Sequence, residues 1–277
     1  MGLRVNTNIA SLTAQRNLGN VTSRLEGNYS RLASGLRIAV AADDAAGLAI
    51  SERMRSQIKS YGVASRNALD GVSLAQTAEG ALNEISSILN RMRELGMQAA
   101  NGTLSSQDRG TLDVEYSALV SEIDRISTTT VFNGTNLLDG SASLGIPIQV
   151  GINSNTTDDV INVTLNETSA STLGFNSTDV TTISNAQSAL NQIDSAIDLV
   201  NTQRGQLGAQ QNRMESALRS IQIQRENLSA SESRIRDVDV AMETAEMTKN
   251  SIMQQAAMSV LQQANVQPQI ALSLLQG

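Results

Sequence analysis

The sequence contains no histidine, no cysteine and no tryptophan. Without histidine the chain lacks the most common general base and the most common transition-metal ligand. Without cysteine it can form neither a disulfide nor a thiolate metal site. The missing histidine also excludes every Ser-His or Cys-His nucleophile. These absences argue against an enzyme, so we expect no catalytic residue, no cofactor and no metal site.

Aromatic residues make up only 2% of the chain, and there are only two prolines, Pro147 and Pro268. The apolar content of 40% is therefore carried by Ala, Leu, Ile, Val and Met, which suit seams between helices better than a thick globular core. Residues 1–146 and 148–267 are free of the strongest helix breaker. The composition favours an elongated, mainly α-helical protein.

Positive charge is also scarce, with 20 basic against 27 acidic residues and a net charge of -7. Nucleic acids and anionic membranes attract proteins with a positive field, so neither is an expected partner. No apolar stretch approaches the length of a membrane span, and the first residues lack the features of a secretory signal peptide.

The C-terminal half has a heptad repeat, which predicts one helix over residues 183–235 with one face packed along a partner. The repeat consists of Ala186, Ile193, Val200, Leu207, Met214, Ile221, Leu228 and Ile235. The interleaved row is half polar: Ile183, Leu190, Ile197, Arg204, Gln211, Leu218, Arg225 and Glu232. Polar residues in such a row can specify the register of pairing.

The N-terminal half supplies a partner of matching period that stops at the Asn101-Gly102 turn signal. Its apolar positions are Ala75, Ala78, Leu82, Ile85, Leu89 and Met92, and a further amphipathic run follows at Leu112, Tyr116, Leu119, Ile123 and Ile126. We predict a coiled-coil seam that includes Leu82, Ile85, Leu89, Leu207, Met214, Ile221 and Leu228. Periodicity alone indicates no more than a generic coiled coil.

Residues 140–182 are rich in Ser, Thr, Asn and Gly. Within them two alternating runs, at 146–150 and 161–165, flank a polar stretch at 153–159, which predicts a β-hairpin. A hairpin between two helical arms would place both termini together at the opposite end of the molecule. The predicted fold is thus a long antiparallel coiled-coil rod with a small hairpin insertion.

Both ends of the chain are weakly charged and amphipathic, and residues 250–277 carry no charged side chain. Such apolar faces are candidates for contacts with other subunits, although they could equally cover each other. The predicted self-assembly residues are Leu3, Ile9, Leu12, Leu25, Leu32, Ile252, Ala256, Val260, Leu261 and Leu275.

Two acidic pairs, Asp43-Asp44 and Asp237 with Asp239, are the nearest approach to a catalytic or metal-binding motif. Adjacent residues point apart on a helix, and no loop of spaced oxygen ligands surrounds either pair. Since Asp is favoured at helix starts, we interpret both pairs as helix-start residues.

Several sequence blocks, which cover most of both arms, resemble those of bacterial flagellins in the order of that family. In the N-terminal arm they are RVNTNIASLTAQRNL (Arg4 to Leu18), RLASGLRIAVAADDAAGLAIS (Arg31 to Ser51), RNALDGVSLAQTAEGAL (Arg66 to Leu82), RMRELGMQAANGT (Arg91 to Thr103), EIDRI (Glu122 to Ile126) and FNGTNLLDG (Phe132 to Gly140). In the C-terminal arm they are LGAQQNRME (Leu207 to Glu215), NLSASESRIRDVDVAMET (Asn227 to Thr244) and QANVQPQIALSLL (Gln263 to Leu275). Two departures stand out: Ala33 replaces the usual Ser, and Gly96-Met97 replaces Ala-Val.

The resemblance implies a structural subunit of the extracellular flagellar filament, exported through the hollow flagellum. Residues 1–43 and 236–277 would form an inner tube of helices, and 44–142 with 183–235 a coiled-coil domain around it, with 143–182 as a short surface insertion. The implied partners are further copies of the chain, the export apparatus and its chaperone, and hook-associated and cap proteins. A hook-filament junction protein of the same superfamily is the alternative.

The resemblance also implies a surface for a host receptor. In flagellins that the flagellin-sensing Toll-like receptor detects, the contact residues map to Arg91, Leu95 and Glu115. Arg91 and Leu95 are four residues apart on a predicted helix, and Glu115 begins the next helical run. We expect an apolar centre flanked by opposite charges.

Overall fold

The computed structural model describes residues 7–155, 157–176 and 178–276, with their side chains up to residue 266. The chain divides into two compact units, which are described separately below. Unit 1 comprises Met1–Ser56 and Asn227–Gly277, and unit 2 comprises Gln57–Glu226. These divisions fall inside long helices, whereas the helices themselves break at residues 35–44 and 237–239.

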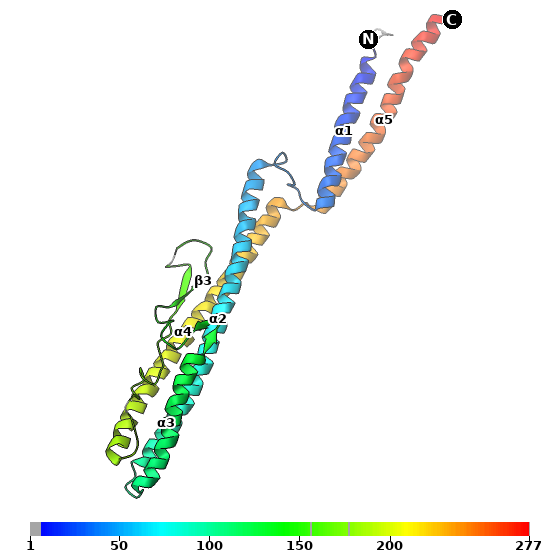
Figure 1. Ribbon diagram of the computed structural model, residues 1–277. Helices are drawn as coiled ribbons and strands as arrows, with labels where there is room; N and C mark the ends of the chain where they lie inside the picture. The colour runs from blue at the N-terminus through cyan, green and yellow to red at the C-terminus, as the bar shows by residue number, and fades with distance from the viewer. Residues whose placement is uncertain (1–6, 156, 177, 277) are drawn as a thin grey trace. The chain divides into compact units, whose positions relative to one another are not determined.

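The fold is mainly α-helical, as predicted, and the order of its elements is shown in Figure 1. The helices are α1 (Ile9–Ser34), α2 (Ala45–Ala99), α3 (Ser106–Thr129), α4 (Ile183–Arg236) and α5 (Val240–Gln276). The strands are β1 (Val131–Phe132), β2 (Thr135–Asn136), β3 (Ile146–Gln149) and β4 (Val160–Val163). The single long helix predicted over residues 183–235 is therefore present as α4.

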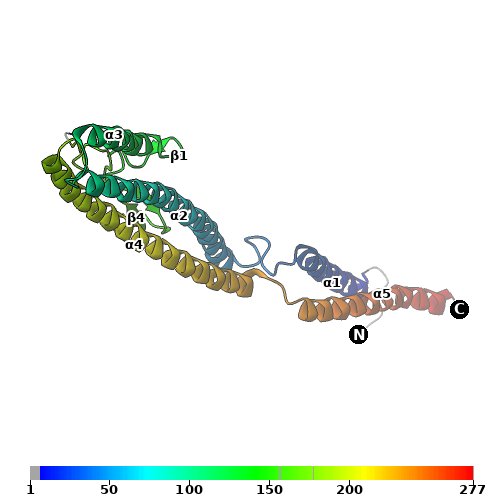
Figure 2. The same ribbon diagram turned by 90° about the horizontal axis from the view of Figure 1, so that it is seen from below.

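In unit 2, α2, α3 and α4 run alongside one another in both views (Figures 1 and 2). The pairing of α2 with α4 is antiparallel, because Arg93 bonds to Asp194 while Glu79 accepts from Gln211 further back along α2. The apolar row of α2 is completely buried, and it meets the heptad row of α4 in one core cluster. The α2 residues of this core include Ala75, Ala78, Leu82, Ile85, Leu89, Met92, Leu95 and Ala99.

The second row of α4 differs from the prediction. The buried positions lie three residues after each heptad residue, at Ala189, Ala196 and Gln203, and not four residues after it. Leu190, Ile197 and the polar Arg204 and Gln211 are only half-buried. The small side chains of Ala189 and Ala196 let the helices approach closely, and the buried Gln203 donates to the Thr164 carbonyl at 3.3 Å.

The predicted β-hairpin is confirmed, with β3 and β4 antiparallel and Ile148 paired with Ile161. It packs against α2, since Asn67 of α2 donates to the Gln149 carbonyl at 3.1 Å and Gly71 faces Ile148. A second, two-residue hairpin joins β1 to β2 and was not predicted. Its Asn133-Gly134 loop has positive φ at both residues, 47° and 80°, as a type I′ turn requires.

The strap, defined as residues 164–176 and 178–182, contributes more to the core than its polar composition indicates. Its residues Leu165, Leu173, Phe175 and Val180 are buried. It runs antiparallel to α3, whose carboxylates hold it: Asp124 accepts from the Ala170 N–H at 2.7 Å, and Asp113 from the Val180 N–H at 2.9 Å. Hydrogen bonds from backbone to carboxylate replace the regular secondary structure that the strap lacks.

Two glycines of α2 provide a matched test of this packing. A Cβ added at Gly80 would meet no atom within 4 Å, whereas a Cβ at Gly71 would lie 2.7 Å from the Met214 sulfur and 3.1 Å from Ile148. We expect Gly80→Ala to stabilise unit 2 by about 0.5–1 kcal/mol, because Ala is the better helix former. Gly71→Ala should destabilise it by about 1–3 kcal/mol through overpacking. Denaturant unfolding of both variants would check the opposite signs, and equal effects would contradict the α2–α4 packing.

Candidate assembly surfaces

In unit 1, α1 and α5 pair antiparallel, so the N-terminal part of α1 lies beside the C-terminal part of α5. Ser11 donates to the Asn265 side chain at 2.7 Å, and Asn8 donates to the Ala264 carbonyl at 2.8 Å. This confirms that the two ends of the chain lie together. The α1–α5 seam follows a heptad pattern on both helices, with Ser11, Ala14, Leu18, Val21, Leu25, Asn28 and Leu32 on α1 and Glu243, Met247, Asn250, Gln254, Ala257, Leu261 and Ala264 on α5.

A polar cluster, which we call the clasp, interrupts the α1–α5 seam. Asn250 donates to the side-chain oxygen of Asn28 at 2.7 Å, and Asn28 donates to Glu243 at 2.6 Å. Arg31 lies 3.5 Å from the same Glu243 oxygen. Asn28 and Asn250 are only 5% and 4% exposed, so these hydrogen bonds satisfy groups that are removed from water.

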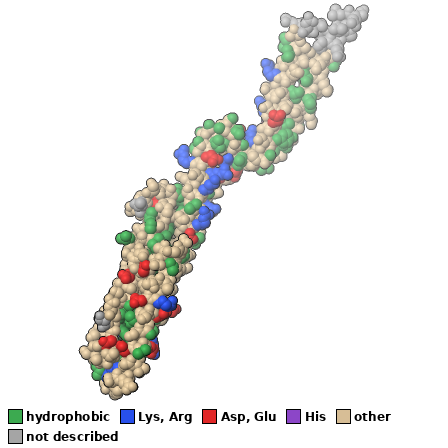
Figure 3. Space-filling model, in the orientation of Figure 1, with side chains coloured by type: hydrophobic (Ala, Val, Ile, Leu, Met, Phe, Trp, Pro, Cys, Tyr) green, Lys and Arg blue, Asp and Glu red, His purple; other side chains and the backbone are tan. Residues whose placement is uncertain are grey.

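An apolar strip on the outside of the pair stays uncovered within the chain. Ile252 and Val260 of α5 are 61% and 57% exposed, and Ala256 lies between them on the same face. On α1, Ile9 and Leu12 are about as exposed. Figure 3 shows hydrophobic side chains over this part of the molecule among few charged ones. The ends therefore cover each other along the seam, as the second sequence alternative expected, and they leave a second face open.

The predicted self-assembly residues accordingly divide between two faces. Ile9, Leu12, Ile252, Ala256 and Val260 belong to the open strip, whereas Leu25, Leu32 and Leu261 lie in the α1–α5 seam and pack within the chain. Leu3 and the side chain of Leu275 lie outside the described residues. Sequence periodicity missed the division because residues of both faces recur every three or four positions along α5.

The predicted coiled-coil seam residues of unit 2 come together in its core. Leu82, Ile85, Leu89, Leu207, Met214 and Ile221 are all buried in the same cluster. Leu228, which follows in the heptad row, belongs to unit 1 and is only half-buried.

One residue of each acidic pair acts as a helix-start residue, whereas Asp237 follows the end of α4 and accepts from the Ser233 hydroxyl at 2.7 Å. Asp44 accepts from the Gly47 N–H at 2.9 Å ahead of α2, and Asp239 accepts from the Ala241 and Met242 N–H groups at the start of α5. Asp43 accepts from the backbone N–H groups of Val40 and Ala39, and these bonds lower the pKa of its carboxyl group. No metal-binding group of three or more acidic side chains occurs among the residues that the structure describes.

The two breaks between helices are tied together within unit 1. Leu36 and Asp237 form an antiparallel bridge, in which the Arg37 N–H donates to the Arg236 carbonyl and the Val238 N–H donates to the Gly35 carbonyl. Gly35 ends α1 in the left-handed conformation, with φ of 71°. The RLASG block of the family therefore supplies a helix terminus, and Ala33 in place of Ser does not disturb it.

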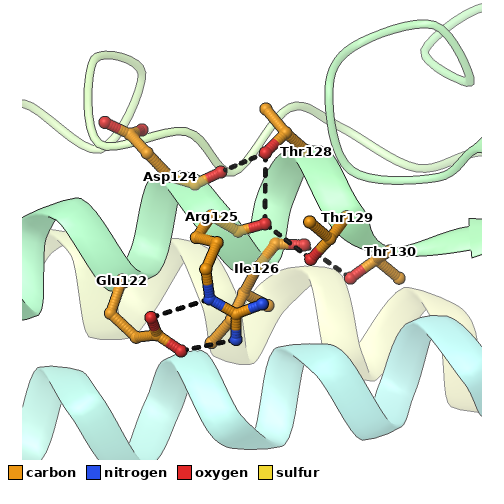
Figure 4. Close-up of polar contacts among 7 residues, drawn as sticks. All are labelled: Glu122, Asp124, Arg125, Ile126, Thr128, Thr129 and Thr130. Carbon is orange, nitrogen blue, oxygen red and sulfur yellow. Dashed lines mark hydrogen bonds and ion pairs between the residues drawn. The ribbon is translucent and has the colours of Figure 1, made fainter.

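The EIDRI block has several structural roles at the end of α3 (Figure 4). Arg125 forms a two-pronged pair with Glu122, with bonds of 2.8 and 2.7 Å. The hydroxyl groups of Thr128, Thr129 and Thr130 donate back to carbonyls one turn earlier, at 2.6–2.9 Å. The Ile126 carbonyl also accepts from the Thr130 N–H, so the Thr130 hydroxyl adds a second bond to the last turn of the helix. Within the block, Asp124 holds the strap.

The three predicted receptor-contact residues are only partly presented. Arg91 bonds to Glu115 at 2.8 Å and to Glu94 at 2.9 Å, and the bond to Glu115 is the main reason that the pKa of Arg91 is raised. Leu95, however, is 1% exposed. It lies three residues after Met92 and four before Ala99, both completely buried, so it belongs to the core face of α2. The expected apolar centre of this surface is therefore wrong, although the opposite charges lie together as expected.

Next to this surface, Gly96 has a packing role that the sequence did not reveal. A Cβ at Gly96 would lie 3.2 Å from Leu190 of α4, so the glycine allows a close approach of the two helices. Helix α2 continues beyond it to Ala99. Met97 is exposed beside it.

Heptad seams in both units, an uncovered apolar strip and polar groups used for capping define a helical structural protein built for association. None of the described helices is long and apolar enough to cross a membrane. Comparison with known proteins identifies the class more closely. The model of the bacterial flagellin N-terminal helical region matches residues 5–143, and that of the C-terminal helical region matches residues 190–275.

Relatives match over nearly the whole chain. A flagellin of Halalkalibacterium halodurans is 46% identical over 98% of this chain and 99% of its own length. A flagellin of Bacillus subtilis is 43% identical over 99% and 100%. Among solved structures, Bacillus cereus flagellin superposes with a TM-score of 0.50 at 36% identity, covering 56% of this chain and 88% of that chain. A putative flagellar hook-associated protein from Vibrio parahaemolyticus, at 14% identity and a TM-score of 0.59, shares the fold alone.

The chain belongs to the bacterial flagellin family. It is a structural subunit that polymerises into the bacterial flagellar filament. Full-length identity to flagellins favours this assignment over the hook-filament junction protein that the sequence had left as an alternative.

The α4 seam can be tested with two nearby residues. Ile221 is 4% exposed and Ile223 is 59% exposed. Ile221→Asp would place a carboxylate in an apolar contact, and we expect it to destabilise unit 2 by about 3 kcal/mol or more. Ile223→Asp should change stability by about 0.5 kcal/mol at most, since its side chain faces water. Thermal unfolding followed by circular dichroism would compare them, and similar melting temperatures would refute the heptad assignment.

Proposed function

We propose that the open strip of α1 and α5 forms the contacts between subunits of the filament. The observation that carries this proposal is the exposure of Ile9, Leu12, Ile252 and Val260 on a helix pair whose other face is already used. Burying one such aliphatic side chain contributes about 1.5–3 kcal/mol. A few of them in each subunit, repeated along a polymer, suffice to offset the entropy that association costs.

The same proposal extends to the organisation of the filament. Residues 1–43 and 236–277 would form its inner tube, residues 44–142 with 183–235 the surrounding coiled-coil domain, and 143–182 a short surface insertion. Residues 250–277 carry no charged side chain. This supports the inner position, because charged side chains are rarely buried and this segment has none that would have to stay in contact with water. The chain would act without catalysis, cofactor or metal.

Membership of the family also supports a route and a set of partners. The subunit would leave the cell through the flagellar export apparatus with the help of an export chaperone. It would then join the growing filament between hook-associated proteins and a cap. No nucleic acid or membrane partner is proposed, because the chain has a net charge of -7.

Polymerisation of purified protein onto filament seeds would test the open strip. We expect an Ile252→Ser, Val260→Ser double variant to lose most of its elongation activity, because each replacement removes apolar burial worth about 1.5–3 kcal/mol. Gln255→Ser with Gln262→Ser is the matched control, since both residues are exposed on α5 and these substitutions also introduce serine into the helix. Electron microscopy and sedimentation would measure the filaments. Normal filaments from the first variant would refute the proposed contact surface.

We also propose that Arg91 and Glu115 contribute to recognition by the flagellin-sensing Toll-like receptor, with Leu95 supporting their helix from within. Arg is a favoured anchor at protein interfaces, although as an exposed ion pair alone Arg91 and Glu115 would contribute under about 1 kcal/mol. The exposed Met97 next to this surface departs from the family pattern and is expected to weaken binding.

A cell reporter assay with monomeric protein would test the receptor surface. We expect Arg91→Ala to reduce signalling without changing the melting temperature, because the side chain is half exposed. Arg125→Ala, which removes a comparable surface pair at the other end of α3, is the control. Equal signalling by the wild type and the Arg91 variant, or no signal from either, would exclude the site.

A further inference from the structure

The apolar part of the α1–α5 seam fixes its own register only weakly. The pattern repeats every seven residues on both helices, and most of its members are interchangeable aliphatic residues such as Leu18, Val21 and Leu25. Sliding α5 by one heptad toward the start of α1 would again place heptad positions opposite heptad positions, although it would separate the Leu36–Asp237 bridge. The displacement is about 10 Å.

The charged pair of the clasp does not prevent this slip either. Arg31 pairs with Glu243, but Arg24 lies one heptad earlier on α1. In the slipped register Arg24 would take the place of Arg31 beside Glu243. The ion pair can therefore form in both registers and cannot distinguish them.

The Asn28–Asn250 pair does distinguish them. In the observed register the Asn28 amide accepts from Asn250 and donates to Glu243, and both asparagines are nearly inaccessible to water. After the slip, Asn250 would face Val21, which offers neither a donor nor an acceptor in its side chain. Glu243, one heptad before Asn250, would take the place of Asn250 beside Asn28. The stranded Asn250 amide disfavours the slipped register by about tenfold or more.

We propose that the hydrogen-bonded set Asn28–Asn250–Glu243 selects the register in which the two ends of the chain pair. A buried asparagine in a coiled coil can specify register at a cost in stability. The inference rests on the proposed function in one respect: register decides which residues of α1 lie level with Ile252 and Val260 on the open strip. A subunit paired one heptad out of register would offer a mismatched surface to the filament.

The chain is free of cysteine, so introduced cysteine pairs can report the register without interference. Ser11→Cys with Asn265→Cys reports the observed register, because these two side chains are hydrogen-bonded at 2.7 Å. Ser11→Cys with Met258→Cys reports the slipped one, since Met258 lies one heptad earlier and is exposed. Oxidation by oxidised glutathione at low protein concentration and non-reducing electrophoresis would separate intrachain from interchain disulfides.

Four backgrounds would carry these cysteine pairs, the fourth being the relocation variant described below. The wild type should form the 11–265 disulfide about tenfold or more faster than the 11–258 disulfide. A triple variant, Asn28→Leu, Asn250→Leu and Glu243→Leu, should lose most of the wild-type difference between the two rates while its helix content and melting temperature are maintained, because apolar replacement of a buried polar set is often neutral or stabilising. The Leu36–Asp237 bridge is the same in every background and favours the observed register equally in each. Glu246→Leu, outside the seam, is the control and should behave as the wild type.

A relocation variant tests the same idea independently of stability. Val21→Asn with Asn28→Leu moves the polar position one heptad along α1, so we expect the 11–258 disulfide to become the faster one. If the triple variant kept the wild-type preference for 11–265 and the relocation variant did not change it, the proposed selection would be wrong. Elongation of filament seeds is measured separately. If the variants changed the register but not the elongation, register selection by the clasp would stand, and the proposed role of the open strip alone would be contradicted.

Discussion

The structure depends on one constraint, the burial of small aliphatic side chains in a chain that has almost no aromatic residues. With 2% aromatics, a thick core is not available, and apolar area must be buried along the length of paired helices. Unit 2 does so between α2 and α4, where Ala, Leu, Ile and Met residues alternate. The backbones lie close together where the helices carry Ala189, Ala196, Gly71 and Gly96. These residues have little side-chain volume, but the close approach of the helices gives the neighbouring atoms more van der Waals contacts.

A long seam of similar residues creates a second requirement, because repetition leaves register undetermined. The chain meets it differently in the two units. In unit 2, the hairpin and the strap give the core an irregular outline, and Asp113 and Asp124 fix the strap to single points of α3. In unit 1 no such insertion packs beside the α1–α5 seam among the described residues, and polar side chains inside the seam are the features that differ from one heptad to the next.

Much of this fold could be predicted from the sequence. Periodicity located α4 and the turn after α2, and alternation located the hairpin β3–β4. The second row of α4 was misassigned because the positions three and four residues after each heptad residue both recur every seven residues. Only the position of the partner helix decides which of these two rows is buried. The β1–β2 turn was missed although its Asn133-Gly134 pair is a recognised hairpin signal. The contribution of the strap to the core was not predicted, because most of its residues are polar and its few apolar ones, such as Phe175, are buried only by tertiary contacts.

The candidate surfaces show the same limit more sharply. Motif positions placed Arg91 and Glu115 together correctly. Arg91 and Leu95, four residues apart, however lie on either side of the boundary between the exposed and the buried face of α2, so Arg91 is half exposed and Leu95 is in the core. On α5, one weakly charged sequence holds two apolar faces, and only the position of α1 separates the seam from the open strip. A helix such as α5 packs one face against its own chain and leaves the other for neighbouring subunits. The face for the neighbours has a defined shape only when the face within the chain pairs in a single register. For this reason, polar residues buried within the chain and apolar residues exposed outside it act together, although each alone would count as a defect in a monomeric protein.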